Sequence, residues 1–361
     1  MILFIADFPT EENIRDGMFQ RISAIDSLTQ NKERVYLNIS FRKNTKRKIS
    51  VYDTCKVESL NYFLHNRTIR EYLKKATIIY VHSVYNMLKI YPFGDFKKII
   101  LDIHGVVPEE MRFLGKRAKA SIYNIIERVS IQRCFKIIHV TSAMKKFYEA
   151  KYNTSLDKRS IVLPIFEKNK IHVDQNKWNS NVYEFIYAGG MQAWQNIDLM
   201  IEATKRTYNK NIKFNFFFPQ NLICEFNSRI GNFFNDKDII IDSLPKEDVI
   251  NVMASCHLGF VLRDDIVVNR VACPTKLIEY LECGVVPVVK SPDIGDFNSL
   301  GYSFIKVDEI CSPLKMEELY EKVENNYRVL AHFQSLTEHS KLILINIFKG
   351  ANTDLENQCI K

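Results

Sequence analysis

The sequence has no long hydrophobic run and no cysteine pair of the kind that binds a metal. No stretch of the 361 residues approaches the roughly 20 consecutive apolar residues of a membrane-spanning helix. The first residues, MILFIADFPTEENIRDG, have no basic leader, so we expect a first β-strand there instead of a signal peptide. The eight cysteines are scattered without a C-x-x-C spacing. This argues against a metal site and a disulfide framework, and it predicts reduced thiols in the cytoplasm.

Negative charge is scarce in the first half of the chain. Residues 1–176 contain 31 Lys and Arg but 18 Asp and Glu, a net +13, whereas the remainder contains 19 and 24, a net −5. Basic clusters at 42–48 and 112–133 supply much of the excess. Such clusters are most often solvated faces, and the functional alternative is an anionic partner such as a membrane surface or a lipid diphosphate. Nucleic acid is not an expected partner, because no recognition motif accompanies the charge.

Apolar, β-branched runs alternate with amphipathic segments along the whole chain. In the first part, strand-type runs cover 2–8, 34–40, 76–83, 97–105, 135–142 and 160–166, with helical patterns at 17–29, 67–75, 113–134 and 143–151. A polar, aperiodic stretch follows at 167–180. A second set of strand-type runs then covers 184–190, 213–219, 238–244, 258–264 and 285–290, with helical patterns at 196–208, 246–255 and 275–283. The alternation predicts two consecutive doubly wound, Rossmann-like α/β domains with mostly parallel sheets.

Chain length supports the same division, because 361 residues suit about two cores at roughly 150 residues each. We expect one domain over residues 1–168, a second over 169–335, and a C-terminal helix and tail over 336–361. The apolar run 336–351 is left over after the second sheet and can pack back on either domain, for instance the N-terminal one.

Ligands of open α/β sheets bind outside the carboxyl ends of the strands, so polar residues just after the strand-type runs are candidates for function. Gly17 follows the first run and suits either a flexible turn or close approach of the backbone to a ligand. His104, followed by Gly105, places an imidazole at a strand end. Glu109 and Glu110 then begin a helix, where carboxylates are favoured by the macrodipole whether or not they bind a substrate.

Two glycines, Gly189 and Gly190, follow the first strand-type run of the second part in the loop GGMQAWQN. The backbone N–H groups of such a loop can face an anion, and an ordinary glycine turn is about equally compatible with the residues. The loop is not G-x-G-x-x-G, so the dinucleotide fingerprint is absent from it.

Three cations precede one helix in the segment RDDIVVNRVACPTKLIEYLECG. Arg263 ends a strand-type run, and Arg270 and Lys276 follow before or at the helix start. Cations are unfavourable at a helix N-terminus, whose dipole is positive. The arrangement makes sense when an anion such as a diphosphate lies among them.

The helix that follows has a recognisable start and end. Thr275 is the expected N-cap, Leu277 faces the core, and Gly284 ends the helix. Lys276 and Glu279 lie three residues apart on one face. They form either a weak surface ion pair or a binding pair, with the lysine on phosphate and the glutamate on the vicinal hydroxyls of a ribose.

Taken with these features, the sequence resembles the GT-B glycosyltransferases, and specifically the retaining family-four group. YAGGMQAWQNIDLMIEA is similar to the glycine loop and following helix of that family. VLRDDIVVNRVACPTKLIEYLECGVVPVV is similar to its nucleotide-binding segment, usually E-x7-E followed by ACG-PV. HGVVPEE is similar to the N-domain loop with a sugar-contacting histidine. The likeness covers the C-terminal domain well and the N-terminal domain loosely, and P-T-K-x-x-E-Y-L-x-C-G is its most specific part.

The sequence departs from the family pattern at identifiable positions. Glu279 matches the second glutamate of E-x7-E, which implies a ribose contact, but the first glutamate falls at Val271. The Arg and Lys that many members place around the glycine loop are Gly190 and Gln195 here. By resemblance, neutralisation of a diphosphate then depends on Arg263, Lys276 and Arg270, with main-chain N–H groups near the glycines.

The resemblance implies a metal-independent enzyme without a cofactor that transfers a hexose-type sugar with retention. The donor is a UDP- or GDP-linked sugar, and the acceptor is a glycan or a lipid-linked glycan. The implied catalytic residues are His104, Arg263 and Lys276, with His104 positioning the donor sugar. The implied nucleotide-sugar-binding residues are Gly17, Gly189, Gly190, Gln192, Arg263, Arg270, Thr275, Lys276, Leu277 and Glu279. Glu109 and Arg112 are the candidates for acceptor contact.

The implied role is synthesis of a bacterial cell-surface polysaccharide such as capsule, O-antigen or exopolysaccharide. The protein would be cytoplasmic and peripheral on the inner face of the membrane through its basic N-terminal domain. Two alternatives share the fold. The missing carboxylate at Val271 and the missing cations of the glycine loop motivate an inactive GT-B-like binding subunit. A sugar-nucleotide epimerase would form product without any acceptor.

Overall fold

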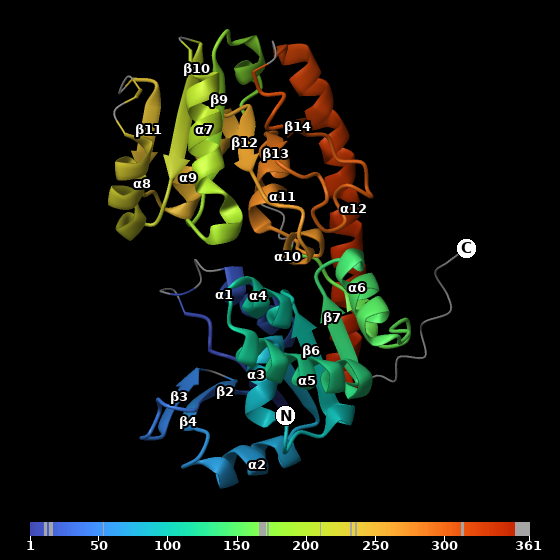
Figure 1. The fold of residues 1–361 in the computed structure, drawn as a ribbon. Coiled ribbons are helices and arrows are strands. Elements are labelled where there is room, and N and C mark those ends of the chain that lie inside the picture. Colours follow the sequence, from blue (N-terminus) through green and yellow to red (C-terminus); the bar gives the residue numbers. More distant parts are fainter. Residues whose placement is uncertain are drawn as a thin grey trace, which may run out of the picture. The chain divides into compact units, whose positions relative to one another are not determined.

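The chain divides into two compact units, each with its own sheet and core (Figure 1). The computed structural model describes residues 1–10, 13, 17–52, 54–165, 171, 173–209, 211–231, 233–234, 237–311 and 314–350. Unit 1 comprises Met1–Ile165 and Leu336–Lys361, and unit 2 comprises Phe166–Ser335.

Unit 1 contains an eight-stranded sheet in the order β3-β4-β2-β1-β5-β6-β7-β8. All neighbouring strands are parallel except β3 and β4, which pair antiparallel at one edge. The strands are β1 (Ile2–Ile5), β2 (Arg34–Ser40), β3 (Lys48–Tyr52), β4 (Cys55–Asn61), β5 (Ile78–His82), β6 (Ile99–Ile103), β7 (Lys136–His139) and β8 (Ser160–Val162). Their central members are buried along their whole length, as a sheet covered on both faces requires.

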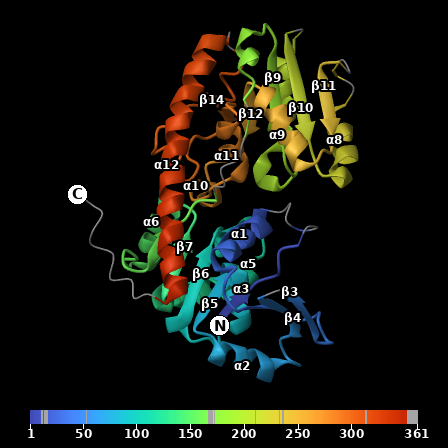
Figure 2. The same cartoon turned by 180° about the vertical axis from the view of Figure 1, so that it is seen from behind.

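Helices cover both faces of this sheet. Figure 1 shows α3 and α5 in front of the strands, and Figure 2 shows α1 and the lower part of α12 on the opposite face. On that opposite face, Ile22 of α1 shares a core with Leu344, Ile347 and Phe348 of α12. The helical segments are α1 (Gly17–Asp26), η1 (Ser27–Thr29), α2 (Asn66–Lys75), α3 (Ser83–Ile90), η2 (Phe96–Lys98), α4 (Val107–Phe113), α5 (Arg117–Arg133), α6 (Ser142–Tyr152) and the end of α12 (Met316–Lys349).

Unit 2 contains a six-stranded, fully parallel sheet in the order β11-β10-β9-β12-β13-β14. Its strands are β9 (Tyr183–Ala188), β10 (Ile212–Phe217), β11 (Ile239–Asp242), β12 (Leu258–Val261), β13 (Val286–Val289) and β14 (Ile305–Lys306). Its helical segments are η3 (Gln175–Asn179), η4 (Ala193–Gln195), α7 (Ile197–Thr207), η5 (Gln220–Leu222), α8 (Ile223–Ile230), α9 (Lys246–Ser255), α10 (Val267–Arg270), α11 (Thr275–Glu282) and the start of α12.

The core of unit 2 brings α11 close to the sheet. Phe185, Phe214 and Phe260 stack across three adjacent strands. Next to them, a Cβ at Gly259 of β12 would lie 2.5 Å from the ring of Tyr280. The absence of a side chain at Gly259 therefore admits the Tyr280 ring, whose hydroxyl donates to the Ile186 carbonyl at 3.1 Å. This contact holds the helix that carries Lys276 against β9 and β12.

The prediction of two doubly wound, mostly parallel α/β folds is confirmed. Several local predictions are wrong in their details. The helical run 113–134 is interrupted at Gly115, which has φ +71°, so that α4 and α5 are separate helices. The run 336–351 is the end of α12, which begins at Met316. Pro274, not Thr275, occupies the N-cap position of α11, and Thr275 is its first helical residue.

The polar stretch 167–180 is not a free connection throughout. Residues 167–170 and 172 lie outside the described residues, but η3 is built into unit 2. There the Lys177 ammonium is buried and donates to the carbonyl oxygens of Cys256, Cys283 and Gly284 at 2.8, 3.0 and 2.9 Å. The sequence pattern also missed α3, α8, α10, the β3–β4 pair and the two-residue β14.

Two predictions from the sequence concern disulfide bonds and membrane-spanning helices. No disulfide forms among the cysteines that the structure describes. Within the same residues, no helix combines the length and the hydrophobicity that crossing a bilayer demands.

Candidate functional site

The first turn of α11 directs Lys276 toward the end of β9. Its ammonium lies 3.5 Å from the centroid of the Tyr187 ring, which is a cation–π contact. The same nitrogen is 3.4 Å from Oε1 of Gln195 in η4. A strand end, a short 3₁₀ segment and a helix start therefore converge on one cation.

A second cation, Arg263, lies in the loop after β12. Its Nη1 is 3.4 Å from Oδ1 of the buried Asn269, and its buried Nε has no hydrogen-bond acceptor among the described residues. Burial lowers the pKa of Arg263 to about 10. Burial and the charge of Arg263 together hold the pKa of Lys276 well below its usual value, with partial compensation from Glu279.

Within the described part of the chain, the two cations have no close counter-charge. Among the described residues, no carboxylate oxygen lies within 4.0 Å of the Lys276 or the Arg263 nitrogens, the limit for an ion pair. The N-terminus of α11 adds partial positive charge and main-chain N–H groups at the same place. Buried charge of one sign is costly unless a partner neutralises it, so this arrangement is suited to binding an anion.

The glycine loop packs directly against Lys276. A Cβ at Gly189, which has φ +149°, would lie 3.0 Å from the Lys276 ammonium. A Cβ at Gly190 would lie 2.6 Å from the Gln192 side chain, and the Tyr187 hydroxyl donates to the Gly190 carbonyl at 2.6 Å. Gly189 therefore has both a conformational and a steric requirement for glycine, because a side chain there would displace the lysine.

Glu279 lies one turn further along α11, where its carboxylate is 3.2 Å from the ammonium of Lys246 on α9. The side chain is partly exposed and belongs to the same helix face as Lys276. Its predicted contact with a ribose stays a prediction.

The other predicted residues of this segment are not all brought to the cation pair. Arg270 forms an exposed ion pair with Asp265, its Nη2 lying 2.8 Å from Oδ2. Leu277 is buried in the core, so its side chain serves packing. Val271 is also buried. Thr275 is at the first helical position of α11, directly before Lys276.

In unit 1, His104 follows β6 and stacks on His82 at the end of β5. The ring centroids are 4.3 Å apart and the planes differ by 21°. Beneath them, Asp102 accepts two hydrogen bonds from Arg21, at 2.9 and 3.0 Å, and a third from the Tyr80 hydroxyl at 2.5 Å. Arg21 also donates to the Leu163 carbonyl at 2.9 Å. The strand ends of β5, β6 and β8 are tied together by this network.

Burial and the charge of Arg21 set the protonation states of the titratable groups near Asp102. Burial opposes ionisation of Asp102, but the charge of Arg21 and its hydrogen bonds outweigh it, so the pKa of Asp102 lies below its usual value. Burial holds the pKa of His82 well below its usual range. The same effect lowers the pKa of His139, at the end of β7, to about 3. The buried imidazoles of His82 and His139 are therefore neutral at pH 7.

One group in the described residues has the geometry of a metal site. Ligand atoms of His82, Asp102 and His104 lie within 4.8 Å of one another. Both oxygens of Asp102 already accept hydrogen bonds from Arg21. A metal ion would compete with a buried guanidinium for the same carboxylate, so the residues fit an ion-pair network better than a metal centre.

The two glutamates that begin α4 have different surroundings. Glu109 is 2.9 Å from both Arg112 and Lys151, which engage its carboxylate in ion pairs. Glu110 is the carboxyl group next to the His104 loop, because a Cβ at Gly105 would lie 2.3 Å from its Oε1. Burial and then the charge of Glu109 raise the pKa of Glu110 to about 7. The predicted acceptor role of Glu109 and Arg112 stays a prediction, and Glu110, which the sequence analysis placed at the same helix start, was given no specific role there.

Gly17 begins α1, and a Cβ built on it would meet nothing within 4 Å. Packing therefore does not require a glycine at this position. Residues 14–16, which precede it, lie outside the described residues.

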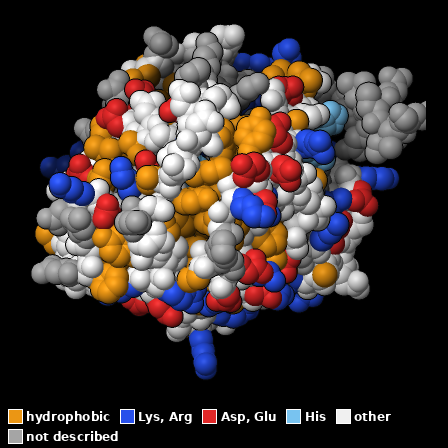
Figure 3. All heavy atoms as spheres, turned by 90° about the horizontal axis from the view of Figure 1, so that it is seen from above, with side chains coloured by type: hydrophobic (Ala, Val, Ile, Leu, Met, Phe, Trp, Pro, Cys, Tyr) orange, Lys and Arg blue, Asp and Glu red, His pale blue; other side chains and the backbone are white. Residues whose placement is uncertain are grey.

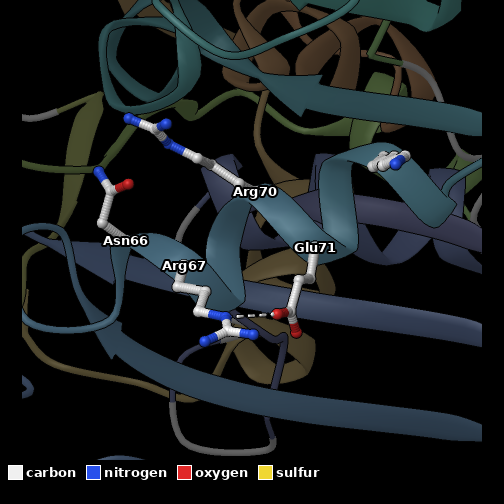
Figure 4. Close-up of a pocket in the computed structure, with 5 residues that line it drawn as sticks. Asn66, Arg67, Arg70 and Glu71 are labelled. Carbon is white, nitrogen blue, oxygen red and sulfur yellow. Dashed lines mark hydrogen bonds and ion pairs between the residues drawn. The ribbon is translucent and has the colours of Figure 1, made fainter.

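A shallow surface hollow lies elsewhere in unit 1, on α2 (Figure 4). Arg67 and Glu71 are turned toward each other there, and the pair is 3.1 Å apart. Arg70 lies over the ring of Phe93 at 4.1 Å. Its two arginines therefore already have partners, and it contains none of the predicted site residues.

The sequence did not select Tyr187, Asn269, Arg21 or Asp102. Tyr187 and Asp102 belong to strand-type runs, where alternation predicts core packing. Arg21 lies within the helical pattern 17–29. Only their positions at the carboxyl ends of the strands, or facing those ends, could have indicated a further role.

No family model matches the chain, and no curated protein matches it by sequence. Solved structures do match it. An Escherichia coli trehalose-6-phosphate structure bound with UDP-2-fluoro glucose has 12% identity and a TM-score of 0.65, covering 96% of this chain and 98% of that one. A sucrose-phosphate synthase from Thermosynechococcus elongatus has 10% identity and a TM-score of 0.66, covering 97% and 98%. The Anabaena protein HepE in complex with UDP and glucose has 10% identity and a TM-score of 0.56, covering 97% of each chain. The neighbours are GT-B glycosyltransferases, and the chain has the GT-B fold.

Proposed function

We propose that this chain, whose fold is that of the GT-B glycosyltransferases, transfers a sugar from a nucleotide diphosphate sugar to an acceptor. Unit 2 binds the nucleotide diphosphate: Lys276 and Arg263 contact the diphosphate, and Glu279 contacts the ribose. His104 of unit 1 positions the donor sugar. Solved neighbours with bound UDP-2-fluoro glucose, or with UDP and glucose, support a uridine-linked donor as the first to test.

The observation that carries this proposal is the partly buried cation pair of unit 2. Lys276 and Arg263 lie beside a helix N-terminus without a carboxylate partner in the described residues. A diphosphate supplies the missing negative charge and can accept hydrogen bonds from the guanidinium, the ammonium and the main chain.

The same cations favour the chemical step. As the bond between the anomeric carbon and the phosphate oxygen breaks, negative charge grows on the leaving diphosphate. Cations fixed at that position stabilise the transition state more than the ground state. The acceptor hydroxyl forms the new C–O bond, and its proton passes to an oxygen of the leaving phosphate. This route needs neither a protein nucleophile nor a metal ion.

The finer assignments follow from the same resemblance. We propose retention of the anomeric configuration, a hexose-type donor, and a glycan or lipid-linked glycan as acceptor. The role is synthesis of a bacterial cell-surface polysaccharide, with the protein in the cytoplasm and associated peripherally with the membrane. The net charge of +13 in residues 1–176 supports attraction to an anionic membrane.

A thermal-shift panel of nucleotides and nucleotide sugars tests the donor site. A ligand at about 100 times its Kd stabilises the native state by roughly 2.7 kcal/mol. We expect a UDP- or GDP-linked sugar to raise the melting temperature of the wild-type protein and to leave that of Lys276→Gln unchanged. Lys213→Gln, which removes an exposed lysine from β10 of the same unit, is the matched control and should respond like the wild type. A Lys276→Gln variant that responded like the control would remove Lys276 from the site.

Product analysis then separates the proposed activity from its alternatives. A transferase releases nucleoside diphosphate and forms glycoside only when the acceptor is present. An epimerase converts the nucleotide sugar without an acceptor, and a binding subunit gives a thermal shift without turnover. Either of these last two results, across a panel of donors and acceptors, would contradict the proposal.

A further inference from the structure

The α5 helix of unit 1 has an apolar face that points to solvent. Ile122 and Ile125 are 51% and 60% exposed, and the partly buried Val129 lies one turn further on. The opposite side of the helix is buried against the unit by Ala120, Glu127 and Ile131. At about 100° per residue, the exposed isoleucines lie roughly opposite the buried side. The helix is therefore apolar on two sides, and only one of them packs against the described residues of the unit.

Basic residues border this apolar strip. Lys119 lies three residues before Ile122, and Arg128 lies three residues after Ile125. Successive steps of three residues rotate by about −60°, so the two cations lie at opposite edges of the exposed side, with the isoleucines between them. Arg133, also exposed, extends the edge on which Lys119 lies. We name these six residues, Lys119, Ile122, Ile125, Arg128, Val129 and Arg133, the α5 outer face.

The charge of this region has one sign. The segment 112–133 contains six Lys and Arg, all exposed, and its single acidic residue, Glu127, is buried and bound to Lys151 and two tyrosine hydroxyls. Immediately before the helix, Phe113 and Leu114 are 44% and 42% exposed beside Lys116 and Arg117. By contrast, the face of the molecule in Figure 3 has acidic and basic side chains interspersed. An ordinary solvated face has the second pattern.

We propose that the α5 outer face is the surface by which the protein lies on an anionic lipid bilayer. A strip of aliphatic side chains flanked by Lys and Arg is the pattern of a helix at the membrane interface, with its isoleucines at the level of the acyl chains and its cations at the headgroups. Nucleic acid fits less well, because the centre of the face is aliphatic and neither Ile122 nor Ile125 can bond to phosphate. This assignment deepens the proposed membrane association and does not depend on the transfer reaction.

Vesicle co-sedimentation of the full chain tests the proposal. The probes are phosphatidylcholine vesicles with and without about one third phosphatidylglycerol. We expect the wild-type protein to bind the anionic vesicles and not the neutral ones, and salt to weaken the binding. Removing two cations in Lys119→Gln/Arg128→Gln should lower the partition coefficient about 25-fold, at roughly fivefold per charge. Ile122→Ser/Ile125→Ser should lower it about tenfold or more, because the apolar contact is lost.

The control variant is Lys213→Gln/Lys306→Gln, which removes the same charge from exposed positions on β10 and β14 of unit 2. It should bind vesicles like the wild type. Sedimentation velocity without lipid reports the oligomeric state of each variant, and thermal unfolding reports whether it is folded. We expect all variants to fold, because all the substitutions are at exposed positions.

The proposal is overturned if the wild type does not bind anionic vesicles, or if both α5 variants bind like the control. It is equally overturned if Ile122→Ser/Ile125→Ser only dissociates a dimer, because the face is then a contact between two copies of the chain. The thermal shift with nucleotide sugar, measured without lipid, reports on the donor site independently of all these outcomes.

Discussion

Both units place an arginine near the carboxyl ends of their strands, Arg21 fully buried in unit 1 and Arg263 partly buried in unit 2, but they neutralise it differently. In unit 1, Arg21 forms two hydrogen bonds with Asp102, at 2.9 and 3.0 Å. In unit 2, Arg263 has Asn269 as its side-chain partner and no carboxylate within ion-pair distance in the described residues. The cation of unit 1 is satisfied by the fold itself. The cation of unit 2 has no such carboxylate in the described part of the chain, and this difference is the basis for proposing a structural role for the first and ligand binding for the second.

The largest expected effect comes from breaking the Arg21–Asp102 ion pair of unit 1. Asp102→Asn removes the counter-charge of a buried guanidinium and should lower the free energy of unfolding by about 3–5 kcal/mol. Both tryptophans of the chain, Trp178 and Trp194, are in unit 2. In urea unfolding of Asp102→Asn, far-UV circular dichroism should therefore show an additional transition of unit 1 at low urea. Tryptophan fluorescence, which reports on unit 2, should not show it. Asp157→Asn, at the exposed partner of Lys145, is the control and should leave both midpoints in place. Equal stability of Asp102→Asn and Asp157→Asn would show that the Arg21–Asp102 ion pair does not stabilise unit 1.

Replacing Arg263, the cation of unit 2, should have the opposite effect on stability. Arg263→Gln removes a partly buried charge that has no carboxylate within ion-pair distance among the described residues, so the ligand-free protein should be as stable as the wild type or more stable. Turnover should fall roughly 10²–10³-fold, or about 2.7–4 kcal/mol, which is the typical loss for one group that stabilises transition-state charge. The measurements are urea unfolding without ligand and initial rates with the donor found by thermal shift. A strongly destabilised Arg263→Gln would show that Arg263 is a structural residue after all.

The lowered pKa of Lys276 predicts that donor binding weakens as the pH rises. Burial and Arg263 disfavour the charged ammonium in the free site, and a bound diphosphate favours it. Above the pKa of the free site, binding then requires uptake of a proton, and affinity should fall by up to about tenfold per pH unit. Isothermal titration calorimetry of nucleoside diphosphate between pH 7 and 8.5, in buffers of different ionisation enthalpy, measures the number of protons taken up on binding. Lys276→Met should bind more weakly and without this pH dependence.

The contact between the glycine loop and Lys276 predicts a smaller effect. Gly189→Ala places a Cβ 3.0 Å from the ammonium, at a φ of +149° that side chains rarely adopt. We expect nucleotide affinity to fall about tenfold, or about 1.4 kcal/mol, because the lysine is displaced. Gly17→Ala has open space around its Cβ and should leave the melting temperature of the ligand-free protein unchanged. Unchanged nucleotide affinity in Gly189→Ala would mean that the loop tolerates a shifted lysine.

The smallest expected effect concerns Glu110 beside the His104 loop. Its pKa of about 7 in the folded protein lies above the usual value of 4.5, so the folded state binds the proton more tightly than the unfolded state. The stability that this provides is present below pH 4.5 and is lost as the pH rises through 7. Glu110→Gln should therefore be more stable than the wild type at pH 8, on the order of 1 kcal/mol or less because the group is partly exposed, with no gain at pH 4.5. Melting curves of both proteins at the two pH values measure this difference.

The fold class was predictable because apolar strand-type runs that alternate with amphipathic helical segments are typical of doubly wound, mostly parallel sheets, whereas the strand orders were not predicted. The β3–β4 pair was missed for a physical reason. All five residues of β3 are exposed, so the strand lacks the apolar run that identifies a buried strand. The break in the helical run 113–134 depends on one residue, Gly115, whose left-handed conformation ends α4.

The candidate site was predictable only in part. Lys276 and Arg263 were identifiable because cations before a helix N-terminus contradict the helix dipole. Tyr187 and Asp102 were not, because an aromatic or a single carboxylate in a strand looks like ordinary core sequence. Arg270 belongs to the same charge pattern, yet the structure gives it Asp265 as a partner. Which of three nearby cations already has a counter-ion is a matter of side-chain geometry, which spacing along the chain does not contain.

The helix α12 has a consequence for how the protein is made. It begins among the core residues of unit 2, at Leu319 and Val323, and ends in the core of unit 1, at Leu344 and Phe348. During synthesis, unit 1 begins first but cannot complete its core until Leu344, Ile347 and Phe348 have left the ribosome. Unit 2 is complete earlier, although it begins later. The usual N-to-C order of domain folding is thus inverted, and a nascent chain that stops before residue 336 exposes an unfinished apolar face on β1, β2 and β5.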